Sequence, residues 1–178
     1  EKIYVTYEAC DDFCMLSPDK DREILDRYGI IEPYIVYLGN VYPHKNPERL
    51  VSAFRRLHEL GKKINLVFIG GEDYFYKRLK NFTKEQGAGN IFFAGFVPDH
   101  DLDIIFHNAR AYIRPSLYEG FELPPLEAMA KGVPVLSSSH PCALEILEDS
   151  ALYFNGEDEE DMARAILKIT VDEKLRED

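Results

Sequence analysis

The amino-acid sequence predicts an α/β domain built on a doubly wound parallel sheet of about six strands. Short apolar runs alternate with amphipathic stretches from about residue 34 to the end of the chain, as expected for a repeated β-α unit. The apolar runs are continuous, which indicates strands covered by helices on both faces of the sheet. A chain of 178 residues is long enough for one such domain with a sizeable core.

Each predicted strand is a short apolar run bounded by polar or turn-forming residues. The six runs lie at residues 34–38, 64–69, 90–94, 111–114, 133–137 and 151–154. Since each run is followed by a helical stretch, the strands are expected to be parallel, with right-handed crossovers. In such a sheet ligands bind at the carboxyl ends of the strands. The loops that follow Leu38, Ala94 and Arg114 are therefore expected to converge at one edge.

The helices are predicted from apolar residues at helical spacing and from start and stop signals. They lie at residues 47–60, 73–86, 101–107, 126–131, 141–147 and 159–170. Asn46-Pro47 is typical of a capped helix start, and Pro124-Pro125 supplies a residue that suits the first helical position. Gly61 and Gly132 are typical of the residue that follows a helix end.

Composition argues against several classes of function. The net charge of −11 disfavours a nucleic-acid partner, because phosphate backbones bind clustered Lys and Arg. No apolar run reaches the roughly 18 residues that a membrane span needs. Three cysteines, Cys10, Cys14 and Cys142, do not form a disulfide framework or a recognisable metal-binding spacing. We expect a cytoplasmic protein without a metal site or direct membrane insertion.

The segment from Pro115 to Met129 is the most informative part of the chain. It places two carboxylates, Glu119 and Glu127, eight residues apart across a loop-to-helix junction. Backbone N–H groups of about residues 120–123 would face an approaching ligand, and such a helix N-terminus favours an anion. Carboxylates together with free N–H groups suit a ligand that is part sugar and part phosphate.

This segment resembles the Glu-x7-Glu motif of retaining GT-B glycosyltransferases, particularly family four. The similarity continues in order over nearly the whole chain, in Gly39-Asn40-Val41-Tyr42-Pro43-His44-Lys45-Asn46, Gly95-Phe96-Val97, residues 132–138, Glu145 and Asn155-Gly156-Glu157-Asp158. The resemblance implies a Rossmann-like domain over residues 1–178 that forms one half of a GT-B enzyme, the half that binds the donor. Residues 1–30, with a short strand at 3–7 and a helix at 18–28, would lead out of an absent N-terminal domain.

The resemblance also implies roles for individual residues. Glu127 would bind the ribose hydroxyls, Glu119 would lie beside the donor sugar, and Lys45 would neutralise the departing diphosphate. Glu119 and Lys45 are thus the expected catalytic residues. The remaining residues expected at the donor are Gly39, Asn40, His44, Gly95, Phe96, Val97, Gly120, Phe121, Glu122 and Leu123. Each main role has a structural alternative, namely a helix-start carboxylate for Glu127, a turn carboxylate for Glu119 and a solvated loop lysine for Lys45.

The sequence departs from the family pattern at two places. The family usually has an arginine a few residues before the lysine, whereas this chain has Asn40-Val41-Tyr42 in that stretch. His44 or Arg114 is expected to take up part of the phosphate charge instead. Glu122 stands where the family commonly has glycine, which adds a negative charge beside the expected sugar pocket.

The leading interpretation is the donor-binding domain of a retaining hexosyltransferase that acts on a saccharide or lipid acceptor. The expected substrate is GDP-mannose or a UDP-hexose, with no further cofactor, and the expected partner is the N-terminal acceptor domain of the same longer chain. Because one domain forms one wall of the cleft, this part alone should bind donor without turnover. The alternatives are a sugar-nucleotide epimerase or phosphorylase of the GT-B type and a non-catalytic nucleotide-binding domain.

Overall fold

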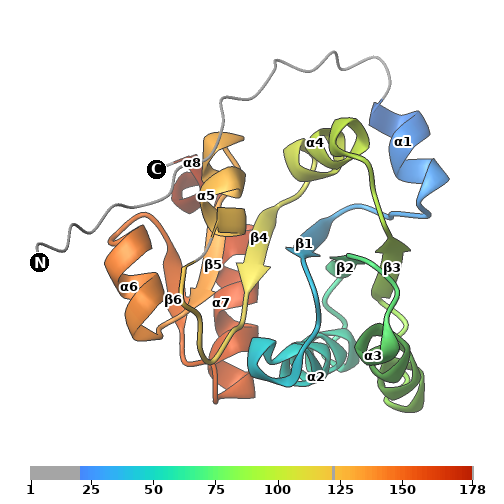
Figure 1. Ribbon diagram of the computed structural model, residues 1–178, viewed down its shortest axis with the longest axis horizontal. Helices are drawn as coiled ribbons and strands as arrows, with labels where there is room; N and C mark the ends of the chain where they lie inside the picture. The colour runs from blue at the N-terminus through green and yellow to red at the C-terminus, as the bar shows by residue number, and fades with distance from the viewer. Residues whose placement is uncertain (1–20, 122, 178) are drawn as a thin grey trace, which may run out of the picture.

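In the computed structural model, which describes residues 21–121 and 123–177, six parallel strands are ordered β3-β2-β1-β4-β5-β6 (Figure 1). The strands are β1 Tyr34–Leu38, β2 Asn65–Ile69, β3 Ile91–Gly95, β4 Ala111–Arg114, β5 Val135–Ser138 and β6 Leu152–Phe154. The strand order reverses between β1 and β4, and ligands of doubly wound sheets bind at the carboxyl ends beside this switch point. The predicted Rossmann-like fold class is confirmed.

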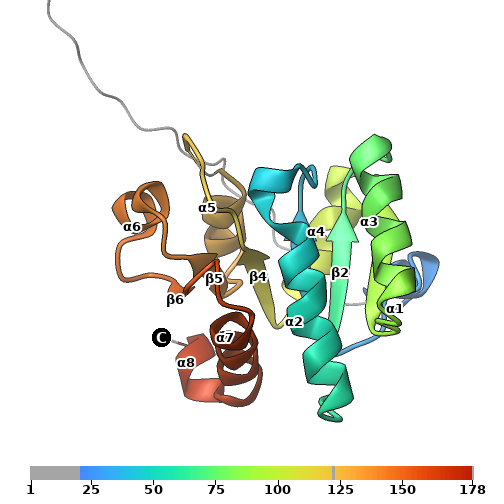
Figure 2. The same ribbon diagram turned by 90° about the horizontal axis from the view of Figure 1, so that it is seen from below.

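Helices cover both faces of the sheet (Figures 1 and 2). They are α1 Asp21–Arg27, α2 Pro47–Glu59, α3 Tyr74–Glu85, α4 Asp99–His107, α5 Leu123–Ala130, α6 Pro141–Leu147, α7 Glu159–Val171 and α8 Glu173–Glu177, with a 3-10 turn η2 at Pro43–Lys45. Buried residues of α2, α3 and α7 share one core cluster with the sheet. Those of α1, α4, α5 and α6 share the other.

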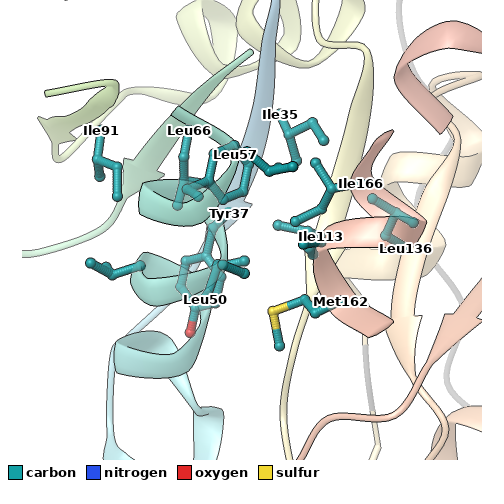
Figure 3. Packing of buried hydrophobic residues seen from close by; sticks show 14 of the residues in the cluster. Ile35, Tyr37, Leu50, Leu57, Leu66, Ile91, Ile113, Leu136, Met162 and Ile166 are labelled. Atoms are coloured by element: carbon teal, nitrogen blue, oxygen red, sulfur yellow. The ribbon is translucent and has the colours of Figure 1, made fainter. Parts of the chain in front are cut away.

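Strand β1 shows why the apolar runs are continuous. Its residues alternate between the two cores, with Ile35 and Tyr37 in the core that Figure 3 shows and Tyr34 and Val36 in the other. All four are fully buried. The two tyrosine hydroxyls are satisfied by donating to backbone carbonyls, Tyr34 to Ile105 O at 2.6 Å and Tyr37 to Asn40 O at 2.5 Å. Burial raises the pKa of both phenols, so both side chains pack as neutral groups.

Several sequence predictions differ from the structure, most of them in their boundaries. Helix α5 begins at Leu123 rather than at residue 126, so Pro124-Pro125 occupies its second and third positions. The first-turn N–H groups of a helix lack intrahelical partners, and two prolines there therefore remove no helical hydrogen bond. Helix α4 begins at Asp99, earlier than predicted, and α8 was not predicted. The expected strand at 3–7 lies outside the described residues.

Gly70, the first residue after β2, is packed too closely for a side chain. A Cβ atom there would lie 2.5 Å from Gly39 O and 2.8 Å from Tyr76 Cζ, with Tyr76 Oη closer still. Tyr76 is buried and donates to Gly39 O at 2.8 Å, so neither neighbour can move without loss. Gly70→Ala is expected to lower the free energy of unfolding by about 1–3 kcal/mol, as measured by urea denaturation.

The neighbouring glycine supplies the matched control. A Cβ atom at Gly71 would meet nothing within 4 Å, and the φ of Gly71 is not positive. Gly71→Ala is expected to change the free energy of unfolding by less than about 0.5 kcal/mol. Equal denaturation midpoints for the two variants would show that the close approach at Gly70 relaxes without cost.

Candidate functional site

The loops that follow β1, β3 and β4 meet at the carboxyl edge of the sheet, as predicted. The turn η2, which follows β1, ends at Lys45, and Glu119 lies in the loop between β4 and α5. Lys45 Nζ donates to Glu119 Oε1 at 2.7 Å. Phe96 and Val97, which follow β3, line a hollow together with Leu38 at the end of β1. The convergence inferred from topology is confirmed.

Glu119 is the centre of a buried polar cluster. Its Oε1 atom accepts from Lys45 Nζ, Arg114 Nη2 and Ser116 Oγ, each at 2.7 Å. The side chains of Lys45, Arg114 and Glu119 are only 12%, 5% and 9% exposed. Burial would raise the pKa of Glu119, but the hydrogen bond from Lys45, the charge of Arg114 and the hydrogen bond from Ser116 together hold this pKa below its ordinary value. Glu119 is therefore ionised at neutral pH.

Arg114 enters this cluster from the last position of β4. Its Nη1 atom lies 3.4 Å from Leu38 O, so the guanidinium group spans the ends of β1 and β4. Gly39 adopts φ 126° and has no side chain, and a Cβ atom there would lie 3.5 Å from Arg114 Nη1. Arg114 and His44 were the two residues expected to share the phosphate charge. Arg114 lies beside Lys45, because both contact Glu119 Oε1, whereas the side chain of His44 is exposed.

The sequence predicted that the Asn46 side chain caps α2, but in the structure it does not. It lies at the N-cap position with φ 59°, but its side chain makes no capping hydrogen bond. Its Nδ2 atom instead donates to Pro115 O at 3.2 Å and to Gly156 O at 2.7 Å. Asn46 thereby joins the loops that follow β1, β4 and β6. Local sequence holds no signal for this role, because the two partners are 69 and 110 residues away.

Glu127 lies in a different environment from Glu119. It lines a hollow of about 480 Å³ at the carboxyl edge, whose other lining residues include Leu38, Phe96 and Val97. The Phe96 side chain is 77% exposed and Val97 is buried. Lys131, one helical turn after Glu127, forms an ion pair with Asp103, and both residues also line this hollow. The motif therefore places one carboxylate among cations and the other in a groove with an exposed aromatic ring.

The other predicted site residues lie at the same edge with varied exposure. Asn40 and Gly120 are exposed, and Gly39, Gly95, Phe121 and Leu123 are half-buried. Gly95 adopts φ 74°, and its carbonyl accepts from Gly70 N at 3.0 Å, which fixes the loop after β3 beside that after β2. Glu122 lies outside the described residues.

Neither a metal-binding cluster nor a membrane-spanning helix is found in the part of the chain that the structure describes. Within residues 21–121 and 123–177, no group of three or more His, Cys, Asp or Glu side chains is arranged to hold a metal ion. Over the same residues, no helix combines the length and apolar character that crossing a bilayer requires.

Comparison with known proteins identifies relatives over nearly the whole chain. The family model described as Glycosyl transferases group 1 matches residues 21–178. O-antigen chain mannosyltransferase B of Escherichia coli is 33% identical over 184 residues, which cover 99% of this chain and 48% of that protein. O-antigen chain mannosyltransferase RfbU of Salmonella typhimurium is 32% identical, over 78% of this chain and 38% of that protein.

Solved structures show the same fold. Sucrose-phosphate synthase from Thermosynechococcus elongatus matches 88% of this chain with a TM-score of 0.73 and 27% identity. Alr3699/HepE of Anabaena, solved in complex with UDP and glucose, matches 91% with a TM-score of 0.78 and 18% identity. This chain covers 41% and 45% of those chains, respectively. The prediction of a Rossmann-like domain that is one half of a GT-B fold is thereby confirmed, and the chain spans about half or less of the length of these relatives.

Proposed function

We propose, from the premise that this chain belongs to the glycosyl transferases group 1 family, that its carboxyl edge binds the nucleoside-diphosphate sugar of a retaining hexosyltransferase. The observation that carries the proposal is the pairing of two environments at one edge. A cationic cluster at Lys45 and Arg114 suits a diphosphate. The adjoining groove, with exposed Phe96 and the Glu127 carboxylate, suits a nucleoside.

Each part of the donor has a place in this arrangement. Lys45 meets the diphosphate and neutralises the charge that grows as this group departs. The Glu127 carboxylate accepts hydrogen bonds from the two ribose hydroxyls, as acidic residues do in dinucleotide-binding domains. Phe96 flanks the base, and Glu119 lies between the phosphate site and the sugar. Mannosyltransferase relatives favour a mannosyl donor, and the UDP complex of a solved neighbour keeps UDP-hexoses as candidates.

The remaining part of the enzyme is proposed to lie in a second domain. The relatives are about twice the length of this chain or more, and that extra length would hold the saccharide or lipid acceptor. Sugar transfer needs donor and acceptor together in a water-poor cleft. The 178-residue chain alone is therefore a donor-binding unit that does not turn over.

The direct test is calorimetric titration of this chain with GDP and UDP, followed by the Glu127→Ala variant. We expect one of the two nucleotides to bind the wild type. Glu127→Ala should weaken that binding by about 1.5–3 kcal/mol, the range for hydrogen bonds to a charged group. Guanosine or uridine should lose a similar amount, because the lost contacts are to the ribose.

Glu159→Ala is the matched control. Glu159, like Glu127, is a glutamate within a helix, but it is exposed and lies in α7, away from the groove that Glu127 lines. This variant removes a helical carboxylate without removing a proposed ligand contact, and it should bind the nucleotide as the wild type does. A wild-type chain that binds neither nucleotide would contradict the proposed function, and unchanged affinity in Glu127→Ala would contradict the ribose role.

A further inference from the structure

We propose that Arg114 is a positioning residue that neutralises Glu119 and thereby releases Lys45 for an anionic ligand. The inference rests on the proposed function, in which that anion is the diphosphate of the donor. It differs from the sequence expectation that Arg114 itself shares the phosphate charge.

Glu119 competes with a phosphate for the ammonium group of Lys45. Its ammonium group is 2.7 Å from Glu119 Oε1, and both side chains are nearly buried. An ion pair in such surroundings is poorly screened, so separating the two charges is costly when neither has another partner. A phosphate would then have to displace Glu119 from Lys45 and would also meet an uncompensated carboxylate.

Arg114 removes both difficulties. Its Nη2 atom donates to the same Oε1 atom at 2.7 Å, and Ser116 Oγ donates there at the same distance. If Lys45 turns toward a phosphate, Glu119 therefore keeps a cation and a hydroxyl donor. Two cations contact one carboxylate oxygen, so Glu119 keeps a positively charged partner when Lys45 turns toward the ligand.

The two cations differ in what holds them. Arg114 belongs to a buried strand, its side chain is 5% exposed, and its Nη1 atom approaches Leu38 O. Lys45 ends a short 3-10 turn, and its side chain is 12% exposed. Lysine also has a flexible stem and a point charge, whereas arginine holds a carboxylate with a planar fork. The geometry thus assigns the fixed role to Arg114 and the ligand-facing role to Lys45.

The test is a double-mutant cycle with Arg114→Gln, Glu119→Gln and the combined variant. GDP and UDP are titrated by calorimetry beside guanosine and uridine, which lack the diphosphate. Arg114→Gln should weaken diphosphate binding by about tenfold, or 1.4 kcal/mol, and leave nucleoside binding unchanged. The combined variant should bind the diphosphate within about threefold of the wild type, since Lys45 no longer has a carboxylate to neutralise.

Each other outcome overturns the proposal. A combined variant as weak as Arg114→Gln would show that Arg114 contacts the phosphate itself. Equal losses of nucleoside and diphosphate affinity in Arg114→Gln would show a structural role for Arg114. Unchanged affinity for both would show that Arg114 has no role in binding. If Arg114→Gln does not fold, the combined variant decides alone, because it removes both Arg114 and the carboxylate that Arg114 is proposed to neutralise. A wild type that binds neither GDP nor UDP contradicts the proposed function instead.

Arg114→Lys adds a further readout. It keeps the positive charge but loses the fork that reaches both Glu119 and Leu38 O. We expect diphosphate binding between that of the wild type and that of Arg114→Gln. Affinity below that of Arg114→Gln would contradict charge compensation as the role of this residue.

Discussion

Asn46→Ala is expected to lower the free energy of unfolding by about 3 kcal/mol, a large effect for a residue outside the hydrophobic core. Asn46 is 7% exposed, and its amide donates to Pro115 O and Gly156 O. Alanine would remove both hydrogen bonds, at about 1 kcal/mol each. It would also have to adopt φ 59°, which costs about 1 kcal/mol for a residue other than glycine or asparagine.

Asn46→Gly separates these two causes. Glycine adopts the left-handed conformation without strain, so this variant loses only the side-chain hydrogen bonds. We expect a loss about 1 kcal/mol smaller than that of Asn46→Ala, measured by urea denaturation at equal protein concentration. A loss below about 1 kcal/mol in Asn46→Ala would show that the three loops are held by other contacts.

The same substitution should affect the site. Asn46 directly follows Lys45, and Pro115 begins the segment that contains Glu119. Loosening the link between these loops would let the two charged side chains separate. Nucleotide affinity of Asn46→Ala should therefore fall even at temperatures where the variant is fully folded.

Lys45→Ala is expected to lower the rate of sugar transfer by about 10²–10³-fold in a chain that also contains the acceptor-binding half. The diphosphate gains negative charge as it leaves the anomeric carbon, and the ammonium group of Lys45 is proposed to stabilise that charge. Because this interaction strengthens in the transition state, kcat should fall more than donor affinity does.

The measurement is product formation followed by NMR, with GDP-mannose and UDP-hexoses as donors. The wild-type product should retain the anomeric configuration of the donor, as implied by the resemblance to retaining enzymes. Lys62→Ala is the control, since Lys62 is an exposed lysine just beyond the far end of α2. Unchanged transfer by Lys45→Ala would contradict the role of Lys45, and an inverted product would contradict the retaining assignment.

The sequence by itself determined the fold class and the edge of the sheet at which the predicted site residues lie. A buried parallel strand such as β1 must be apolar on both faces, so its composition alone reveals it. The alternation of such runs with helical stretches then fixed a doubly wound sheet and placed the loops after β1, β3 and β4 at one edge. The spacing of Glu119 and Glu127 identified the informative loop, and the family match over residues 21–178 agrees with the family that this loop suggested.

Only the tertiary structure decided what the polar side chains contact. Asn46 has the sequence context of a helix cap, yet its amide binds carbonyls on two distant loops. Arg114, at the end of β4, and Lys45, in the connection between β1 and α2, share one oxygen of Glu119. The physical reason is the separation along the sequence over which each kind of interaction acts. Secondary structure follows from the pattern of neighbours within a few residues, whereas a buried charge or amide takes whichever partner the fold brings within about 3 Å.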